Sequence, residues 1–243
     1  MKFLVLALAL LAAAPATADD AINAALADPG RASDASADAR RHPAELAAFA
    51  QIKPGDTVVD LIPGSGYFTR IFSTLVGPKG HVYAIWPDAY ANEDQDDVAL
   101  TIAIMQDKRY ANVSVLFQPA DKLTTPTPAD VVWTSQNYHD YPDKFMGSND
   151  VKVLNDAVFK ALKPGGRYIV VDHVADARSG LRDTDTLHRI DPDAAKSQIV
   201  GAGFTFDGES TVLRNSADTH KLTVFDKAIR GHTDQFAYRF KKP

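Results

Sequence analysis

The stretch "VVDLIPGSGYFTR", residues 58–70, is the clearest indication of the fold in the sequence. Residues 57–62 have the apolar character of a buried strand, and Gly64 and Gly66 then form a tight turn. Residues 67–76 follow with their apolar side chains on one helical face. A strand that runs through a glycine turn into a helix indicates the first unit of a parallel α/β sheet. Ligands of such sheets bind beyond the carboxyl ends of the strands, which is where this turn lies.

The rest of the chain repeats this alternation of strands and helices. Strand patterns lie at residues 81–86, 112–117, 129–134, 167–173, 204–213 and 235–240, and helix patterns lie at residues 42–52, 97–106, 149–162 and 191–203. Asp191 and Pro192 are typical of the first positions of a helix. Strongly apolar strands separated by helices predict a doubly wound, Rossmann-like α/β sheet that helices cover on both faces.

The amino-terminal residues have the three-part pattern of a secretory signal. Lys2 precedes an almost unbroken apolar run at residues 3–14, and residues 16–18 form an A-x-A cleavage site. We therefore expect a signal peptide at residues 1–18, cleavage before Asp19, and an exported protein that is periplasmic or secreted. A retained membrane anchor at the amino terminus is the alternative interpretation.

The remaining chain is expected to hold one domain. Residues 19–42 are poorly apolar and predict a mobile N-terminal arm with a helix near residues 21–27, and residues 43–243 predict the functional domain. The chain has no Cys, so it holds neither a disulfide nor a thiolate metal site. A formal net charge of -5 and the lack of a basic run argue against a nucleic-acid partner. No later segment is long and apolar enough to predict membrane contact after signal cleavage.

The glycine turn is a candidate ligand site in its own right. Gly64 and Gly66 lie where a side chain would block the close approach of a ligand to the backbone, and Ser65 stands between them. The helix that follows points its free N–H groups into the same space. Asp60 ends the strand, where it can hold an amide of the turn or a cationic group of a ligand. A plain connection between strand and helix remains the alternative.

The chain resembles class I S-adenosylmethionine-dependent methyltransferases over nearly the whole length that follows the signal. The matching motifs are "VVDLIPGSGYFT", against a family pattern that is commonly D-x-G-x-G-x-G, then "ADKL" at residues 120–123, "ADVVWTSQNYHD" at residues 129–140, "LKPGGRYIVVDH" at residues 162–173 and "AGF" at residues 202–204. Within that superfamily the chain resembles an exported branch described as predicted methyltransferases. The resemblance implies a seven-stranded, mostly parallel sheet with an antiparallel last strand, and S-adenosylmethionine as cofactor.

The resemblance also implies cofactor-binding residues and exposes departures from the pattern. Asp60 and the residues of the glycine turn would hold the cofactor, and Asp121 would meet the adenine amine. Ile62 stands where the family usually has Gly. Trp86 stands where the second strand usually ends in an acid that binds the ribose hydroxyls, and Asp88 lies two residues further on. We expect Trp86 to line the cofactor site and Asp88 to reach the ribose.

The polar stretch "SQNYHDYPD", residues 135–143, follows the fourth strand and predicts the acceptor side of the site. His139 is the candidate general base, and Asp140 or Asp143 would orient it or raise its pKa. Tyr138 is a candidate substrate contact. For both side chains, ordinary packing in a loop is the alternative.

Two further residues precede the helix at residues 191–203. His188 is predicted to point into the pocket, and Arg189 is predicted to clamp a carboxylate or phosphate of the substrate. A surface ion pair is the alternative for Arg189. The histidines and acids of the chain show no recognised metal-ligand spacing, so no metal is expected.

Together these features predict a methyltransferase that acts on a small-molecule acceptor at a hydroxyl. The alternative is an exported ligand-binding protein, or a different enzyme, that kept this fold and lost the use of S-adenosylmethionine. The substitutions at Ile62 and Trp86 favour the alternative, whereas Asp60, Gly64 and Asp121 favour the methyltransferase.

Overall fold

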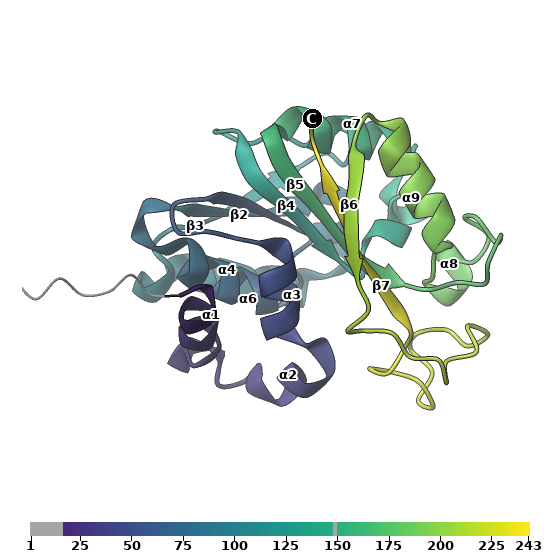
Figure 1. Ribbon diagram of the computed structural model, residues 1–243, viewed down its shortest axis with the longest axis horizontal. Helices are drawn as coiled ribbons and strands as arrows, with labels where there is room; N and C mark the ends of the chain where they lie inside the picture. Colours follow the sequence, from purple (N-terminus) through teal and green to yellow (C-terminus); the bar gives the residue numbers. More distant parts are fainter. Residues whose placement is uncertain (1–16, 148–149) are drawn as a thin grey trace, which may run out of the picture.

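The computed structural model describes residues 17–147 and 150–243. Within these residues the strands form one seven-stranded sheet in the order β3-β2-β1-β4-β5-β7-β6 (Figure 1). The strands are β1 (Thr57–Leu61), β2 (His81–Pro87), β3 (Val113–Gln118), β4 (Ala129–Ser135), β5 (Leu162–His173), β6 (Thr205–Ser210) and β7 (Gln235–Lys241). β7 runs antiparallel to both of its neighbours, and the other pairs are parallel. The predicted fold class is confirmed.

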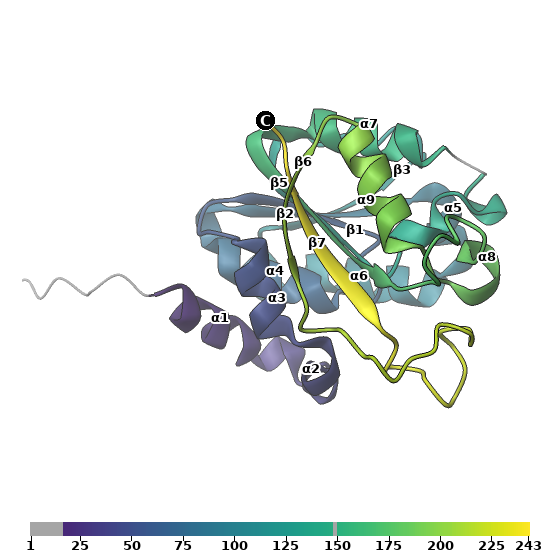
Figure 2. The ribbon, with the colours of Figure 1, turned by 45° about the vertical axis from the view of Figure 1, so that its right-hand side comes forward.

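Helices cover both faces of the sheet, as Figures 1 and 2 show. The α-helices are α1 (Ala18–Leu26), α2 (Ala35–Arg41), α3 (Pro43–Ala50), α4 (Tyr67–Val76), α5 (Asp88–Glu93), α6 (Gln95–Gln106), α7 (Val151–Ala161), α8 (Thr184–Leu187) and α9 (Pro192–Gly201). Short 3₁₀ turns are η1 (Pro29–Arg31), η2 (Gly77–Lys79), η3 (Lys108–Tyr110), η4 (Tyr138–Asp140) and η5 (Lys144–Met146). One layer contains α1, α3 and α4, and the other contains α7 and α9.

Alternating side chains of the central strands build the two cores. Val58 and Val131 are paired across β1 and β4 and pack under α4, whereas the neighbouring pair Val59 and Val132 packs under α7. All four side chains are fully buried. Burial on both faces explains why these strands are continuous apolar runs instead of alternating polar and apolar residues.

The amino-terminal segment is docked on the domain, which corrects the expected mobile arm. α1 confirms the helix predicted near residues 21–27, and Ile22 is buried against the core beneath α4. Asp34, next to α2, pairs with Arg70 at 3.1 Å, and the Tyr67 hydroxyl donates to Asp38 at 2.5 Å. The composition of the segment hid this docking because its polar side chains pair with residues of α4 that are distant in the sequence.

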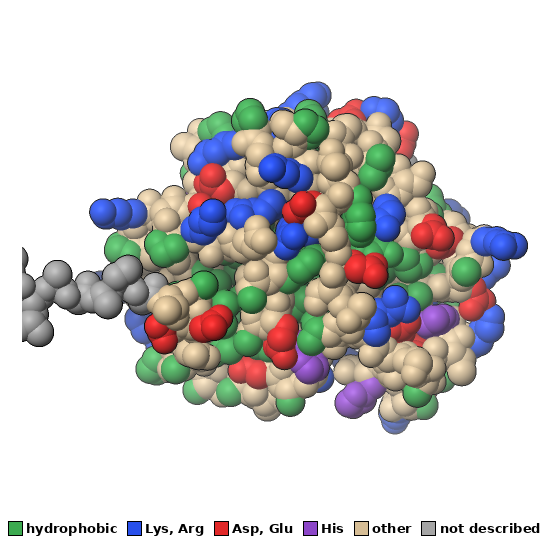
Figure 3. Space-filling model, viewed as in Figure 1, with side chains coloured by type: hydrophobic (Ala, Val, Ile, Leu, Met, Phe, Trp, Pro, Cys, Tyr) green, Lys and Arg blue, Asp and Glu red, His purple; other side chains and the backbone are tan. Residues whose placement is uncertain are grey.

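Residues 1–16 of the predicted signal lie outside the described residues, so the signal stays a prediction. Among the residues that the structure describes, no helix has the length and apolarity needed to cross a membrane. Lysine, arginine and acidic side chains are interspersed over the face drawn in Figure 3.

Candidate active site

A pocket of about 620 Å³ opens at the carboxyl ends of the central strands. The glycine turn after β1, the junction of α5 and α6, the loop after β4 and the end of β5 contribute to its wall. His188, which follows α8, and residues 224–225, from the segment between β6 and β7, complete the wall. Because β1 lies between β2 and β4, the pocket occupies the switch in strand order where such sheets bind their ligands.

The turn after β1 keeps a glycine-like shape although one glycine is replaced. Ile62 has a left-handed backbone with φ 55°, a conformation that is unfavourable by about 1–2 kcal/mol for a residue with a side chain. Its N–H donates to the Ile85 carbonyl at 2.9 Å, and its carbonyl accepts from Asn137 Nδ2 at 2.9 Å. These two bonds hold the turn in the shape that a glycine would otherwise supply.

The two glycines of the turn have different roles. A Cβ at Gly66 would lie 2.1 Å from Ile104 Cδ1, so Gly66 permits the close packing of α6 and does not line the pocket. A Cβ at Gly64 would meet only Asp97 Oδ2 at 3.4 Å, and Gly64 and Ser65 both line the pocket. Gly64 therefore leaves pocket space open, whereas Gly66 packs against α6 outside the pocket wall, and cofactor contact by either glycine stays a prediction.

Asp60 lies in the pocket wall, where the sequence placed it, and is 2% exposed. Thr69 Oγ1 donates to Asp60 Oδ2 at 2.6 Å. Burial raises the pKa of the Asp60 carboxyl to about 7, although the Thr69 bond and the Arg41 guanidinium act in the opposite direction. A cationic ligand group in the pocket would favour the ionised carboxylate.

Three more acids face the same space from the junction of α5 and α6: Glu93, Asp94 and Asp97. Burial, together with the nearby Asp94 and Asp96, raises the pKa of the Asp97 carboxyl. This acidic wall favours a ligand that carries positive charge. Sequence reasoning missed these acids because it looked for a single carboxylate at the end of β2.

Neither Trp86 nor Asp88 takes the place of the ribose-binding acid that usually ends β2 in the similar methyltransferases. Trp86 is fully buried in the core and lies outside the pocket wall, with its ring centre 6.0 Å from that of Tyr90. Asp88 is exposed at the start of α5, and Asp121 is exposed beside a separate cavity next to α7. The structure therefore places none of these three residues in the pocket wall. α5 begins directly after β2, and this helix contributes Tyr90 and Glu93 to the pocket wall.

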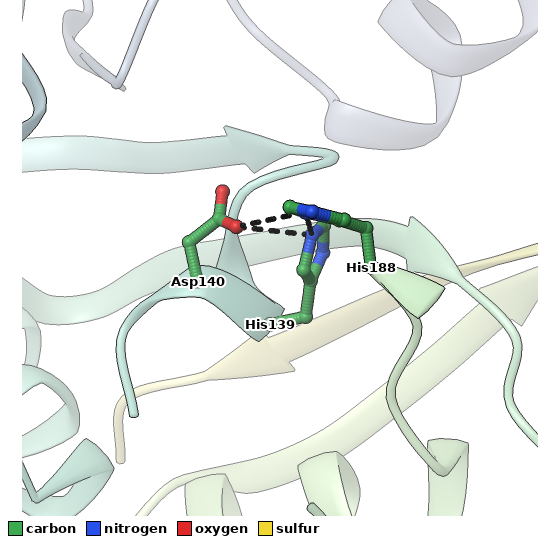
Figure 4. Close-up of side chains that lie close together, drawn as sticks. All are labelled: His139, Asp140 and His188. Atoms are coloured by element: carbon green, nitrogen blue, oxygen red, sulfur yellow. Dashed lines mark hydrogen bonds and ion pairs between the residues drawn. The ribbon is translucent and has the colours of Figure 1, made fainter. Parts of the chain in front are cut away.

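Two histidines and two acids meet on the other side of the pocket. His139 Nδ1 lies 2.8 Å from Asp172 Oδ1, and the His139 backbone N–H donates to Asp172 Oδ2 at 2.8 Å. His139 Nε2 lies 3.1 Å from Asp140 Oδ1 and 3.4 Å from His188 Nδ1. Figure 4 shows that His139 and Asp140 extend from η4 and that His188 points toward them from the other side. The structure thus brings together three of the predicted site residues.

The charges around His139 keep its ring protonated. Burial alone would lower its pKa, but the carboxylates of Asp172 and Asp140 raise the pKa of His139 well above its ordinary value. Burial would likewise raise the pKa of Asp140, but the imidazoles of His139 and His188 hold it at about 2. The predicted rise in the pKa of His139 is present, yet its main partner is Asp172 and not Asp143. A ring held in this way does not accept a proton at neutral pH.

Two predicted substrate contacts are structural. Tyr138 is fully buried, and its hydroxyl accepts a hydrogen bond from Asn155 Nδ2 at 2.9 Å. Arg189 is also fully buried; it pairs with Asp218 at 2.8 and 3.2 Å and donates to two backbone carbonyl groups. Neither residue lines the pocket, so the structure does not place them at the acceptor side as predicted. Arg189 forms an ion pair, as the alternative interpretation expected, but the pair lies in the interior and not on the surface.

Other pocket residues carried a weaker signal in the sequence. His173 ends β5 next to Asp172, lines the pocket and has Nδ1 2.7 Å from Thr233 Oγ1. Burial and the nearby His139 lower the pKa of His173 well below its ordinary value, so its ring is neutral. Arg41 forms part of the wall, with its guanidinium 4.4 Å from the centre of the Tyr67 ring.

Comparison with known proteins finds methyltransferases that are similar in sequence and in fold. The ubiquinone/menaquinone biosynthesis C-methyltransferase UbiE of Ectopseudomonas mendocina is 31% identical over 189 residues, which are 76% of this chain and 62% of that protein. A S-adenosylmethionine-dependent methyltransferase from Mesorhizobium loti has a similar structure, with a TM-score of 0.56, 20% identity, and coverage of 82% of this chain and 96% of that one. The chain has the fold of S-adenosylmethionine-dependent methyltransferases and is similar in sequence to a C-methyltransferase.

The limits of this similarity are also informative. The chain spans less than two thirds of the length of the curated UbiE relative, and a scan of family models finds no match. The [4+2]-cyclase SpnF has the same fold, with a TM-score of 0.63 at 17% identity over 84% of this chain and 81% of that one. A methyltransferase fold therefore supports cyclisation in a neighbour, so the fold alone does not define the reaction.

Proposed function

We propose that this protein transfers a methyl group from S-adenosylmethionine to a small-molecule acceptor bound beside His139. The observation that carries the proposal is that the glycine turn and the His139 cluster open into one pocket of about 620 Å³. This volume is typical of sites for small ligands. The cofactor would lie against Gly64, with its positive charge near the acids Asp60 and Asp97, and the acceptor would lie against His139 and His188.

The reaction needs two reactants in line more than it needs a strong base. The acceptor supplies an electron pair to the methyl carbon, the carbon–sulfur bond breaks, and its electron pair stays on sulfur, which becomes neutral. A hydroxyl acceptor would release its proton to solvent, because His139 is already protonated. Holding both reactants in one pocket can supply much of the rate enhancement. We favour a hydroxyl acceptor because polar side chains gather around His139. The name of the UbiE relative makes a carbon acceptor the competing case.

Native mass spectrometry and calorimetry with S-adenosylmethionine and its demethylated product test the proposal. We expect binding of one molecule per chain. An absence of binding at millimolar cofactor would exclude the methyltransferase and favour a binding protein, or another enzyme, on this fold. A screen of metabolites, read as release of S-adenosylhomocysteine, would then identify the acceptor and the atom that is methylated.

Replacing Gly64 with valine is expected to weaken S-adenosylmethionine binding by at least about tenfold, because the added side chain would occupy ligand space. Gly55 provides the matched control. It also has a left-handed backbone, with φ 89°, and a Cβ there would meet nothing within 4 Å. Gly55→Val therefore adds similar backbone strain away from the pocket. Equal loss of affinity in the two variants, measured by calorimetry, would attribute the effect to strain and not to ligand contact.

Ligand binding is expected to change the fluorescence of Trp133 and not that of Trp86. The chain has two tryptophans. Trp133 lines the pocket beside Phe68, with ring centres 4.6 Å apart, whereas Trp86 lies in the opposite core. The Trp86→Phe variant should keep the signal and the Trp133→Phe variant should lose it. A signal that survives in Trp133→Phe would place the ligand elsewhere.

The affinity for S-adenosylmethionine is expected to rise with pH through about 7, by up to about tenfold between pH 6 and pH 8. The Asp60 carboxyl has a pKa of about 7, so its ionised fraction grows over this range, and the ionised form attracts the sulfonium cation. Calorimetry at several pH values measures the effect. Asp60→Asn should bind more weakly with a flatter profile. A wild-type profile that is flat, or that falls with pH, would contradict this role of Asp60.

We also propose that the protein acts outside the cytoplasm, on the strength of the signal pattern at residues 1–18. Cell fractionation followed by mass determination tests this. We expect the exported form to begin at Asp19, whereas a cytoplasmic chain that retains Met1 would contradict export. Cleavage there would remove Thr17, whose side chain caps α1.

A further inference from the structure

We propose that His139, Asp140 and His188 bind one divalent transition-metal ion on the acceptor side of the pocket. The ligand atoms would be His139 Nε2, Asp140 Oδ1 and His188 Nδ1. Figure 4 shows these side chains directed at one another. They form a compact group of possible metal-binding side chains, and all three line the pocket.

The spacing of the three atoms suits an ion without rearrangement. His139 Nε2 lies 3.1 Å from Asp140 Oδ1 and 3.4 Å from His188 Nδ1, and His188 Nδ1 lies 3.5 Å from Asp140 Oδ1. Metal bonds of about 2.0–2.2 Å, at angles between square and tetrahedral, place neighbouring donor atoms about 2.8–3.6 Å apart. The three separations all fall within that range.

A buried carboxylate orients the first ligand. Asp172 is fully buried and lies 2.8 Å from His139 Nδ1, on the side of the ring that faces away from Asp140 and His188. With one proton held at Nδ1 by this contact, Nε2 is the nitrogen that binds the ion, which displaces the Nε2 proton of the metal-free ring. Asp172 also accepts from the backbone N–H groups of His139 and His173, which fixes its own position. Metal-bound histidines commonly have such a carboxylate behind them.

The backbone of His188 is strained in a way that aims its side chain. His188 has a left-handed conformation with φ 53°, which is uncommon for a residue other than glycine. Its N–H donates to the Thr184 carbonyl at 3.0 Å, and the preceding Leu187 carbonyl accepts from the Val224 N–H at 3.2 Å. Strain that the surrounding structure maintains is commonly found at functional sites. Here it directs an imidazole at the other two ligand atoms.

The ligand chemistry selects the class of ion. Two imidazoles and one carboxylate suit zinc, iron, cobalt or manganese, whereas magnesium and calcium prefer oxygen atoms alone. Three protein ligands leave coordination positions free, and these face the pocket. If the proposed methyl transfer is correct, an oxygen atom of the acceptor would take a free position and be held toward the methyl group. The binding of an acceptor oxygen to the ion rests on the proposed function, whereas the metal site itself does not.

Titration with Co²⁺ tests the site directly. The full chain is freed of metal with EDTA, dialysed, and titrated without S-adenosylmethionine while its visible absorption is recorded. Because the chain has no Cys, any spectrum arises from nitrogen and oxygen ligands. We expect one Co²⁺ per chain, with displacement by Zn²⁺. If Co²⁺ does not bind stoichiometrically when protein and ion are both at about 0.1 mM, the proposal is overturned. A dissociation constant of roughly that size is the weakest that would keep an ion in the site.

Variants locate the ion. His188→Ala and Asp140→Asn should each weaken Co²⁺ binding by more than about tenfold, and Asp172→Asn should weaken it by about 10–100-fold. His220→Ala is the matched control, because His220 Nε2 also pairs with a carboxylate, Asp234, at 3.1 Å. That variant should bind as the wild type does. The side chain of His188 is 30% exposed, so its removal should leave the fold intact, which circular dichroism checks.

Wild-type affinity in His188→Ala would overturn the proposed site. Calorimetry of the metal-free chain with S-adenosylmethionine is done in parallel. Co²⁺ binding without cofactor binding would support the metal site and refute the methyltransferase. Cofactor binding without Co²⁺ binding would support the methyltransferase and overturn the metal site.

Discussion

Replacing His139 with alanine is expected to lower kcat by about 10²-fold, the loss expected when an acceptor is misplaced, and to change the affinity for S-adenosylmethionine by less than about threefold. His139 Nε2 faces the pocket beside Asp140 and His188, where the acceptor is proposed to bind. The cofactor is proposed to lie on the glycine turn and the acidic wall, which the substitution does not touch. The loss should therefore appear in turnover, measured as release of S-adenosylhomocysteine with an acceptor from the metabolite screen.

His232→Ala is the control for this experiment, because His232 is exposed and lies outside the pocket. It should retain wild-type turnover. A His139→Ala enzyme with nearly normal kcat would remove His139 from the mechanism, whether as a metal ligand or as a direct acceptor contact. Positioning of the two reactants would then be the main source of catalysis.

Replacing Arg189 with alanine is expected to destabilise the fold by about 3–5 kcal/mol, because the substitution leaves the Asp218 carboxylate buried without its main cationic partner. Two carbonyl groups, those of Val174 and Leu222, also lose their donor. For a chain of this size the melting temperature should fall by roughly 6–20 °C. Thermal unfolding followed by circular dichroism measures the change.

Arg182→Ala is the matched control for Arg189→Ala. Arg182 pairs with Asp183 at 2.8 Å, but its side chain is 64% exposed, and surface pairs contribute about 0–1 kcal/mol. The double variant Arg189→Met with Asp218→Asn removes both charges and should recover part of the lost stability. If Arg189→Ala melts at the same temperature as Arg182→Ala, the internal ion pair does not stabilise the fold as we infer.

The sequence predicted the elements that depend on local pattern. The helix expected at residues 67–76 is α4, and the strand expected at residues 235–240 is β7 with one residue more. Asp191 caps α9 as expected, accepting from the Asp193 N–H at 3.0 Å. Periodic apolar residues and capping side chains act over a few positions, so a single sequence carries enough information to locate them.

The sequence located site residues only where their position directly after a strand is enough to place them at the carboxyl edge of the sheet. His139 follows β4 and Gly64 follows β1, so each lies at the carboxyl edge whatever its side chain contacts. The direction of Arg189 depends on Asp218, 29 positions away in the chain, and nothing near Arg189 in the sequence indicates it. The proposed metal ligands likewise come from two loops, with His139 and His188 separated by 49 positions, so they form no spacing motif.

The position of β7 between β5 and β6 has a consequence for the order in which the molecule assembles. During translation β6 emerges from the ribosome before β7, yet among the described strands β7 is its sheet neighbour. β6 must therefore wait, unpaired, until the 211–234 segment and β7 have been made. That segment carries Val224 and Phe225, which close one side of the pocket. A nascent chain that stalls after β6, before residue 211, would thus have the glycine turn and His139 but no enclosed place for an acceptor.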